Sequence, residues 1–334
     1  LGDANSKVST ATQVPIANDP FFMEVDASLT HSLALDEEGK VYTWGSNING
    51  DLGLGTSGNN VASPLQMSGL PPMRKIATGY FHSLGIAQNG RLWTWGSGWD
   101  GQLGVGAAST GYKPMATRLD QVIGIAAGTR HSVALKSDGT VWAWGLNTCG
   151  QVGNNTQGNN LALPTQVLAN AQAVAAGFSC TYALMNDGTV MAWGLNDTGQ
   201  LGNGTRVNQK IPTLVPGLTE VVKLAAYGNG AMALKADGSL WIWGGNGNGQ
   251  LGDNGVVDSL VPIPVAGAMN LVPDVNIHLG PGGWHNLIAL GNGDVYSWGA
   301  NHSDQLGYSS PQNPHRQPVT AVPDGLGGIF NLLD

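Results

Sequence analysis

A Trp-Gly pair recurs along the whole chain, and its spacing constrains the fold more than any other feature of the sequence. The pairs begin at Trp44, Trp95, Trp144, Trp193, Trp243 and Trp298, so they are separated by 51, 49, 49, 50 and 55 residues. Around every pair, 22 residues align without a gap, from 13 residues before the Trp to 8 residues after it. Such a repeat indicates similar units that stack on one another to bury their apolar faces. We therefore interpret residues 1–334 as a single domain.

Each unit has the pattern of a run of short β-strands. In the third unit, the apolar run Val122–Ala127 is followed by the alternating run HSVAL, a Ser-Asp-Gly turn and the alternating run VWAWG. An Asp-Gly or Asn-Gly turn between alternating runs is the strongest local signal for a β-hairpin. A further segment with Pro and Val, Leu163–Val167 in this unit, completes the pattern. Four strands in about 50 residues form one blade of a β-propeller.

Two motifs carry a resemblance to a known family. The segments Ile76–Ile86 and Ile125–Leu135, and the run Trp-Gly-x-Asn-x-x-Gly-Gln-Leu-Gly, resemble the hallmarks of the regulator of chromosome condensation (RCC-type) repeat family. The likeness covers essentially the whole chain. It implies an all-β, seven-bladed β-propeller. It does not imply one function, because a fold of this kind hosts many functions.

The seventh blade is incomplete when the strands are counted by type. The Pro/Val segment occurs seven times, beginning with Thr12–Ile16, and the strand before the Gly turn also occurs about seven times, ending with Gly327–Leu332. The HSLAL-type and Trp-Gly strands occur only six times each. We therefore expect six complete units and a split or incomplete seventh blade formed by the two termini. The missing strands could belong to a longer parent protein, be absent from a two-stranded seventh blade, or be supplied by another chain.

Composition narrows the class of partner. A net charge of −8 with only 14 Lys and Arg excludes a cationic surface of the kind that binds nucleic acid. No apolar run reaches 18 residues, so we predict no membrane span.

The low charge content, 11%, and the richness in Gly and Asn are typical of an extracellular or periplasmic protein, which we predict to be bacterial and secreted. A cytoplasmic location is the alternative.

One repeat position raises the question of a metal site. The residue 13 positions before each Trp is His31, His82, His131, Cys180, Gly230 or His285. Equivalent positions in neighbouring blades lie too far apart for one ion, which needs ligands at about 2.0–2.3 Å. We therefore expect no metal, and each His to bond backbone groups at a blade junction. Cys149 and Cys180 should share one face of neighbouring blades, so they either form a disulfide or are two free, buried thiols.

The loops, rather than any catalytic motif, indicate the functional surface. The sequence contains no nucleophile elbow, zinc-protease motif, phosphate loop or dinucleotide fingerprint, so we predict no enzyme activity and no cofactor. Aromatic residues and Arg, the types that carry interface energy, vary at fixed loop positions on one face. The predicted partner-binding residues are Tyr80, Phe81, Trp99, Arg130, Phe178 and Trp284. The alternative is that these turn side chains fold back onto their blades.

These observations favour a non-catalytic, extracellular protein-binding scaffold that recognises a protein partner through one loop face. Two alternatives use the same fold differently. The first is a regulator of a small GTPase, similar to a guanine-nucleotide exchange factor. The second is a structural subunit of a surface assembly or filament, which self-associates through the open seventh blade.

Overall fold

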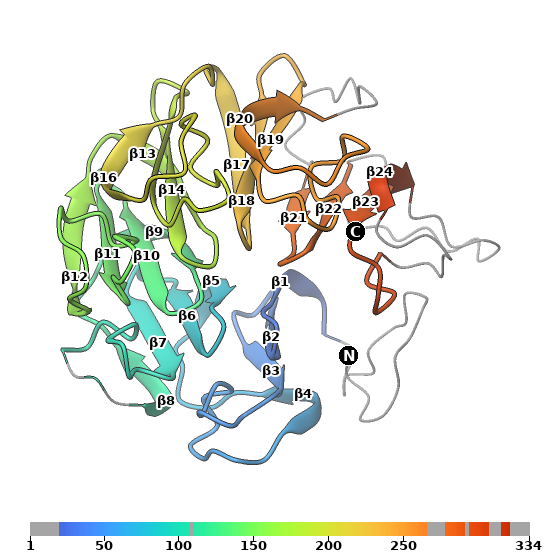
Figure 1. The fold of residues 1–334 in the computed structure, drawn as a ribbon. Helices are drawn as coiled ribbons and strands as arrows, with labels where there is room; N and C mark the ends of the chain where they lie inside the picture. The colour runs from blue at the N-terminus through green and yellow to red at the C-terminus, as the bar shows by residue number, and fades with distance from the viewer. Residues whose placement is uncertain are drawn as a thin grey trace.

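The chain folds into a ring of β-sheets. A computed structural model describes residues 20–106, 108, 110–265, 278–290, 294–306 and 315–320. In this part of the chain, 24 strands form six four-stranded antiparallel sheets around a common centre, and there is no helix (Figure 1). The described residues therefore contain no helix that could cross a membrane. The all-β propeller predicted from the repeat is confirmed.

Each sheet takes its four strands from one repeat, in chain order from the centre outward, and we number the sheets as blades 1 to 6. Blade 1 contains β1 (Phe22–Ala27), β2 (His31–Asp36), β3 (Val41–Gly45) and β4 (Val61–Gln66), and blade 2 contains β5 (Met73–Thr78), β6 (His82–Ala87), β7 (Leu92–Gly96) and β8 (Gly111–Ala116). Blade 3 contains β9 (Val122–Ala127), β10 (His131–Lys136), β11 (Val141–Gly145) and β12 (Leu161–Leu168), and blade 4 contains β13 (Ala171–Ala176), β14 (Cys180–Met185), β15 (Val190–Gly194) and β16 (Gln209–Leu214). Blade 5 contains β17 (Val221–Tyr227), β18 (Gly230–Lys235), β19 (Leu240–Gly244) and β20 (Ser259–Pro264), and blade 6 contains β21 (His278–Pro281), β22 (His285–Ala289), β23 (Val295–Gly299) and β24 (His315–Thr320).

The predicted hairpin turns join the second and third strands of the blades. In blade 3, Gly139 has φ = 79°, a left-handed conformation that glycine adopts without a steric penalty. The preceding Asp138 accepts hydrogen bonds from the backbone N–H and the hydroxyl of Thr140, at 3.0 and 2.6 Å. These bonds lower the pKa of Asp138 and fix the turn. The sixth predicted turn, Asn292-Gly293, lies outside the described residues.

The outermost strands contain the prolines of the repeat. Pro lacks an N–H group and is tolerated in a sheet mainly at an edge. The fourth strand of each blade pairs on one side only, and it holds Pro64, Pro114, Pro164, Pro212, Pro262 or Pro318. The Pro/Val segments predicted as strands in the six complete units are therefore confirmed as edge strands.

The core lies between neighbouring blades. The Trp of each Trp-Gly pair inserts into the preceding blade, as Trp144 does when it packs against Leu84, Ile86 and Leu92 of blade 2. Trp95, Trp144, Trp193, Trp243 and Trp298 are fully buried. These five tryptophans of the repeat therefore belong to the core. Trp44 differs, because it is only half-buried.

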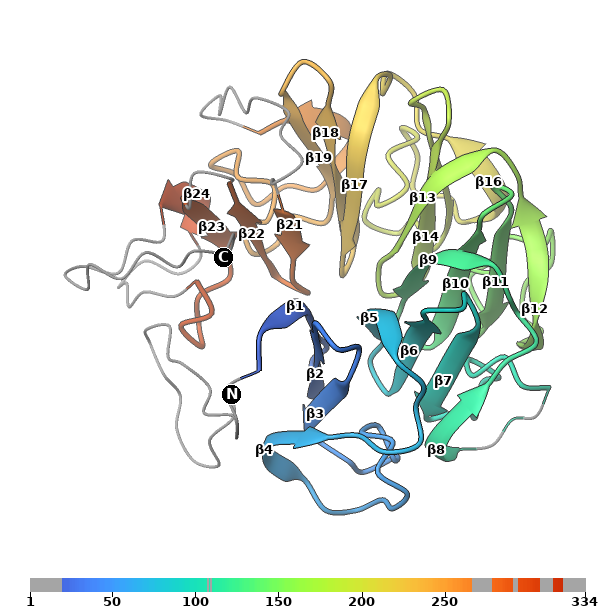
Figure 2. The same ribbon diagram turned by 180° about the vertical axis from the view of Figure 1, so that it is seen from behind.

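The described sheets number six, whereas the repeat predicts seven blades with a split seventh. The two segments assigned to that blade, Thr12–Ile16 and Gly327–Leu332, lie outside the described residues. The blade count of seven is therefore not confirmed. In Figure 2 the sheet β1–β4 and the sheet β21–β24 lie at the two ends of the series of described blades.

Candidate protein-binding face

Two sets of loops gather on one face of the ring, which we call the loop face. The Gly turn joins the first two strands of a blade, and the Trp-Gly loop joins the last two. In every blade they are tied together by a backbone hydrogen bond, as from Ser97 N–H to Phe81 O at 2.8 Å and from Leu146 N–H to Arg130 O at 2.8 Å. All six predicted partner-binding residues belong to these loops, so the structure places them on one face.

Over blades 2 and 3, Tyr80 contacts Phe81, Arg130 contacts Phe81, and Trp99 precedes Asp100, the ion-pair partner of Arg130; we call these four residues the aromatic cluster. The rings of Tyr80 and Phe81 meet edge to face, with centroids 4.1 Å apart. The guanidinium of Arg130 lies 5.9 Å from the centroid of Phe81. Arg130 also pairs with Asp100, with an N–O distance of 3.3 Å, and Asp100 in turn accepts a hydrogen bond from Asn160 at 2.9 Å. These contacts fix the cation in place beside an aromatic ring.

Trp99, the fourth member of the aromatic cluster, is the most exposed aromatic residue of the loop face. Its side chain is 71% exposed. Its indole N–H nevertheless donates to the Thr110 hydroxyl at 2.8 Å, so the orientation of the ring is fixed. An exposed apolar side chain held in one orientation loses little conformational entropy when a partner covers it.

Phe178 lies apart from the aromatic cluster, at the mouth of the central cavity. Its ring packs so closely against Gly228 and Gly283 that a Cβ atom at those positions would lie 2.9 and 3.2 Å from ring carbons. Leu29, from blade 1, reaches the same Gly283. Phe178 therefore packs against the Gly turns of blades 5 and 6 and does not fold back onto its own blade, blade 4.

Trp284 occupies a third part of the loop face. It is 42% exposed and lies 6.4 Å from the ring of His302, centroid to centroid. The structure thus brings Tyr80, Phe81, Trp99 and Arg130 together, and places Phe178 and Trp284 separately.

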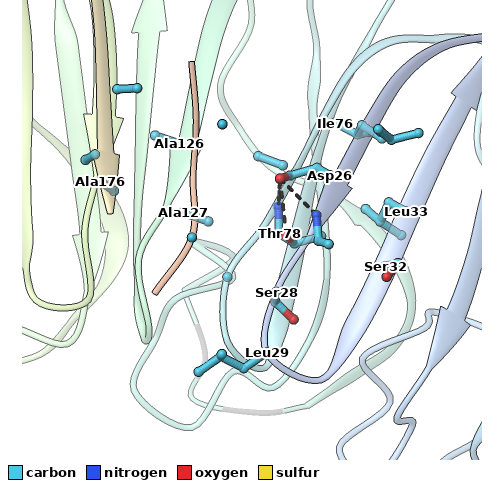
Figure 3. A pocket seen from close by; sticks show the side chains of 18 of the residues that line it. Asp26, Ser28, Leu29, Ser32, Leu33, Ile76, Thr78, Ala126, Ala127 and Ala176 are labelled. Atoms are coloured by element: carbon cyan, nitrogen blue, oxygen red, sulfur yellow. Dashed lines mark hydrogen bonds between the residues drawn. The ribbon is translucent and has the colours of Figure 1, made fainter. Parts of the chain in front are cut away.

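The inner strands of all six blades line a central cavity of about 1220 Å³. Ala and Gly are the commonest residues of its walls, and Ala126, Ala127 and Ala176 are examples (Figure 3). Glu24 and Asp26 of β1 face β5, where they accept hydrogen bonds from the Ile76 and Thr78 N–H groups at 3.0 and 2.6 Å. Burial raises the pKa of both carboxyl groups. Both therefore connect blade 1 to the free edge of β5.

The repeated histidines tie neighbouring blades together through hydroxyl groups. His31, His82 and His131 each place Nε2 at 2.8 to 3.0 Å from the hydroxyl of the next blade, on Ser83, Ser132 and Thr181 respectively. The junction role predicted for these residues is correct, but the partner is a side-chain hydroxyl rather than a backbone group. Burial lowers the pKa of His131 to about 4, so its ring is neutral at pH 7. No group of three or more His, Cys, Asp or Glu side chains that could hold a metal occurs in the described part of the chain.

The two cysteines are separate free thiols in the structure, which differs from the predicted disulfide, and of the alternative of two free, buried thiols only Cys180 is buried. Cys180 is buried, and its sulfur lies 3.3 Å from the hydroxyl of Tyr182 in the same blade. Burial raises the pKa of the Cys180 thiol to about 11. Cys149 is half-buried in the loop of blade 3.

The repeat, the blade geometry and the junction contacts agree with a comparison against family models. The model described as the RCC1-like domain matches residues 1–288. The chain belongs to this family.

Curated relatives of this RCC1-like domain are much longer proteins. The human "Probable E3 ubiquitin-protein ligase HERC6" is 33% identical over 107 residues, which is 31% of this chain and 10% of that protein. The Caenorhabditis elegans "X-linked retinitis pigmentosa GTPase regulator homolog" is 39% identical over 94 residues, 28% of this chain and 7% of that protein. The matches thus cover a tenth or less of these two relatives.

Solved structures show the same fold. The RCC1-like domain superimposes on the crystal structure of human WBSCR16 with a TM-score of 0.81 and 22% identity, covering 93% of this chain and 83% of that chain. It superimposes on yeast RCC1 (Prp20), solved bound to Kap60, with a TM-score of 0.79 and 21% identity, covering 91% and 76%.

Sequence reasoning missed two exposed apolar residues on the loop face of this RCC1-like domain. Leu29 and Ile48 are 48% and 67% exposed. Ile48 occupies the same repeat position as Trp99, 51 residues earlier, so alignment of the units could have found it. Leu29 aligns in the same way with Tyr80. Both residues extend the apolar surface of the loop face onto blade 1.

Proposed function

We propose that the chain is a non-catalytic scaffold that binds a protein through the aromatic cluster of the loop face. The observation that carries the proposal is Trp99, an exposed indole that a hydrogen bond to Thr110 holds in one orientation. Arg130 lies beside it in a fixed position, paired with Asp100. Aromatic residues and Arg in rigid positions are the usual anchors of an interface.

The fold neighbours support a protein as the partner. One yeast neighbour is solved as a complex with Kap60, and another is described by its binding properties to Gsp1p and histones. One curated relative bears the name of a GTPase regulator homologue. The exchange-factor alternative would need a protruding wedge, and the one notable insertion, Met269–Pro281 before the sixth unit, lies outside the described residues from 269 to 277. The aromatic cluster is therefore the better supported surface.

Comparison of variants tests the loop face. We expect Trp99→Ala and Arg130→Ala each to weaken partner capture about fivefold or more, because truncated anchors typically cost more than 1 kcal/mol. The measurement is quantitative cross-linking of the purified chain in an extract of its source cells, read by mass spectrometry. Ile123→Ala is the matched control, since Ile123 is 46% exposed but lies at the opposite end of β9 from the loop face. Equal capture by all variants would refute the proposal.

We propose an extracellular or periplasmic location, which the acidic composition and low Lys content support. We also infer that the complete ring has seven blades. The support is the half-buried state of Trp44, whose five equivalents are fully buried. A seventh blade that these residues do not complete would also support the alternative that copies of the chain assemble through the open blade.

A further inference from the structure

One position of the repeat distinguishes blade 4 from the other blades. The residue two positions before the Trp of each Trp-Gly pair is aromatic in five units and methionine in blade 4. In chain order these residues are Tyr42, Trp93, Trp142, Met191, Trp241 and Tyr296. Trp142 packs at the junction of blades 2 and 3, and Met191 packs at the junction of blades 3 and 4. Blade 4 therefore lacks the aromatic ring that the other blades bring to this place.

A groove of about 570 Å³ lies along Met191. It runs between β12 and β16, the outermost strands of blades 3 and 4, which contact each other (Figure 1). Its apolar lining consists of Val167, Leu168, Met191, Ile211 and Pro212. A volume of this size is within the range of sites that bind a ligand group. The groove thus presents apolar surface at the junction where blade 4 has no aromatic ring of its own.

The other blades show how this repeat holds an indole ring. The indole N–H of Trp142 donates to the hydroxyl of Thr140 at 3.0 Å, and the amino group of Lys136 lies 6.0 Å from the ring centroid. Blade 5 repeats both contacts, at 3.0 and 5.8 Å, with Trp241, Ser239 and Lys235. A hydroxyl oxygen therefore accepts the indole N–H, and a long side chain of the second strand lies over the ring.

Blade 4 keeps the hydroxyl of this arrangement. The hydroxyl and the N–H of Thr189 donate to Asp187 at 2.6 and 3.0 Å, the same distances that the equivalent Thr140 makes in blade 3. A Thr hydroxyl oxygen can accept hydrogen bonds while its own hydrogen is donated. Because residue 191 is Met, blade 4 supplies no indole N–H to this oxygen.

A second methionine takes the place of the cation. Met185 occupies the position of Lys136 and Lys235, and it packs with Met191 against the same hydrophobic cluster. Both methionines are half-buried. Thioether sulfurs make favourable contacts with aromatic rings, and a flexible Met side chain adapts to a ring that enters. Blade 4 therefore replaces a built-in ring and its cation by two adaptable apolar side chains.

We propose that the groove between β12 and β16 binds the indole ring of a tryptophan in a protein partner, in the place that the other blades fill with their own ring. Asn155 and Gln166 line the same groove and are exposed, so their amide groups can bond the peptide backbone on either side of that tryptophan. Trp is among the residue types that most often anchor a protein interface. The groove lies on the outer side of blades 3 and 4, so it is independent of the aromatic cluster on the loop face.

NMR of the methionine methyl groups tests this site. The probe is the peptide Ac-Ser-Gly-Trp-Gly-Ser-NH2, titrated into the full chain labelled with ¹³C at the Met methyl groups. We expect the ring current of the indole to shift the signals of Met191 and Met185 saturably. The signal of Met115, on β8 of blade 2, should not move. A peptide with Ala in place of Trp should shift none of them, and equal shifts by both peptides would refute the indole as the bound group.

Two further comparisons define the groove and its hydrogen bond. Met191→Trp restores the residue type of the other blades, and its ring should fill the groove and weaken peptide binding about tenfold or more. Met115→Leu is the matched control and should bind as the unchanged protein does. A peptide with 1-methyltryptophan, which has no indole N–H, should bind about fivefold more weakly, the value of one net hydrogen bond.

The possible results separate the site from its hydrogen bond. An unshifted Met191 signal at saturating peptide, or binding that Met191→Trp leaves unchanged, would refute the groove as an indole site. Equal binding of the 1-methyltryptophan peptide would refute the part assigned to Thr189. Because the methyl shifts are measured on the unchanged protein, the test does not depend on the folding of any variant.

Discussion

At the residue scale, one junction shows how a lost contact is compensated. Between blades 4 and 5 the His of the repeat is Cys180, and the hydroxyl residue that would receive it is Ala231. Both members of the pair are therefore lost together, which avoids a buried imidazole or hydroxyl without a partner. The hydroxyl of Tyr182 donates to Gln200 O at 2.6 Å, and Trp243 donates to the same oxygen. Tyr182 thus replaces the missing hydroxyl at this loop carbonyl.

The joint loss of the His and of the hydroxyl can be seen in the sequence, but the sequence does not show that these two positions contact each other. Alignment of the units places Ser, Thr, Ala or Asn directly after the His position, and the loss at Ala231 follows the loss at Cys180. The His position alone suggested backbone partners, because the unit alignment does not show that strand β2 of one blade faces strand β6 of the next. The hydroxyl partners became evident only from the arrangement of the ring.

Asp51 is buried, and we expect its replacement by Gln to raise the free energy of unfolding. The equivalent residues of the other units are Gln, and Gln102 accepts a hydrogen bond from the N–H of Asp100 at 2.9 Å. Asp51 accepts a longer bond of 3.2 Å from Asn49 N–H, its Oδ1 has no partner, and burial raises its pKa to about 6.

A carboxyl whose pKa is raised on folding binds its proton more tightly in the folded state, so its ionisation destabilises the fold above pH 6. We predict that Asp51→Gln raises the free energy of unfolding by about 1–2 kcal/mol at pH 7.5. The gain should shrink towards pH 4.5, where the folded protein keeps Asp51 protonated. Urea unfolding at the two pH values measures this, with Asp51→Asn as the neutral but shorter control. An equal effect of Asp51→Gln at both pH values would contradict the assignment.

At the scale of the element, the contacts at the end of the third strand of a blade explain why Gly follows Trp in the Trp-Gly motif. Gly145, at the end of β11, has φ = 101°, and a Cβ atom there would lie 2.6 Å from Arg130 O. The carbonyl belongs to the Gly turn that bonds the loop after Gly145. Glycine is therefore needed for its backbone conformation and also for the close approach of the two loops.

Two glycine substitutions separate the cost of losing the left-handed conformation from the cost of the close contact between the loops. Gly158 has φ = 91°, similar to Gly145, but no atom lies within 4 Å of its Cβ position. Gly158→Ala should cost about 1–2 kcal/mol, from the left-handed conformation alone. Gly145→Ala should cost about 1–3 kcal/mol more, because the clash is with backbone atoms that cannot rotate away. Guanidinium unfolding of both variants measures the difference, and equal losses would show that the contact with Arg130 is unimportant.

The strands themselves were the most predictable part of the fold. Alternating apolar residues and Asp-Gly turns are local signals, so the segment predicted as Val122–Ala127 is the whole of β9. The aromatic cluster was less predictable, because the contact between Phe81 and Arg130 joins two blades. Phe178 and Trp284 occupy loop positions equivalent to Tyr80 and Phe81, but the ring places them on other blades. Local patterns indicate on which face a side chain lies, whereas the arrangement of the blades in the ring determines which side chains contact one another.

At the scale of the whole molecule, the blade junctions make stability dependent on pH. Burial lowers the pKa of His31 to about 4, of His82 to about 3 and of His131 to about 4. An unfolded His has a pKa of about 6.5. Below that pH the unfolded chain binds protons that the folded chain does not, so stability is complete above pH 6.5 and falls as the pH decreases towards 4.

The histidines and the carboxyl groups act in opposite directions. At pH 5, each of the three histidines costs about 2 kcal/mol relative to pH 7.5, since one pKa unit corresponds to about 1.4 kcal/mol. Asp51, whose pKa is raised to about 6, acts in the opposite direction and makes the protein about 1 kcal/mol more stable at pH 5 than at pH 7.5. Glu24 and Asp26 also have raised pKa values, so they oppose the loss in the same direction as Asp51. We therefore predict that the three histidines lower the free energy of unfolding towards pH 5 and that these carboxyl groups reduce the loss.

Urea unfolding at pH 7.5, 6 and 5 measures this loss, and His131→Gln identifies its source. The variant should be less stable than the unchanged protein at pH 7.5, because the bond to Thr181 is altered. Between pH 6 and 5, however, its stability should fall by about 1.4 kcal/mol less, because one titrating group has been removed. An equal fall in His131→Gln and in the unchanged protein would mean that the His131 imidazole takes up a proton inside the fold, which would contradict its lowered pKa.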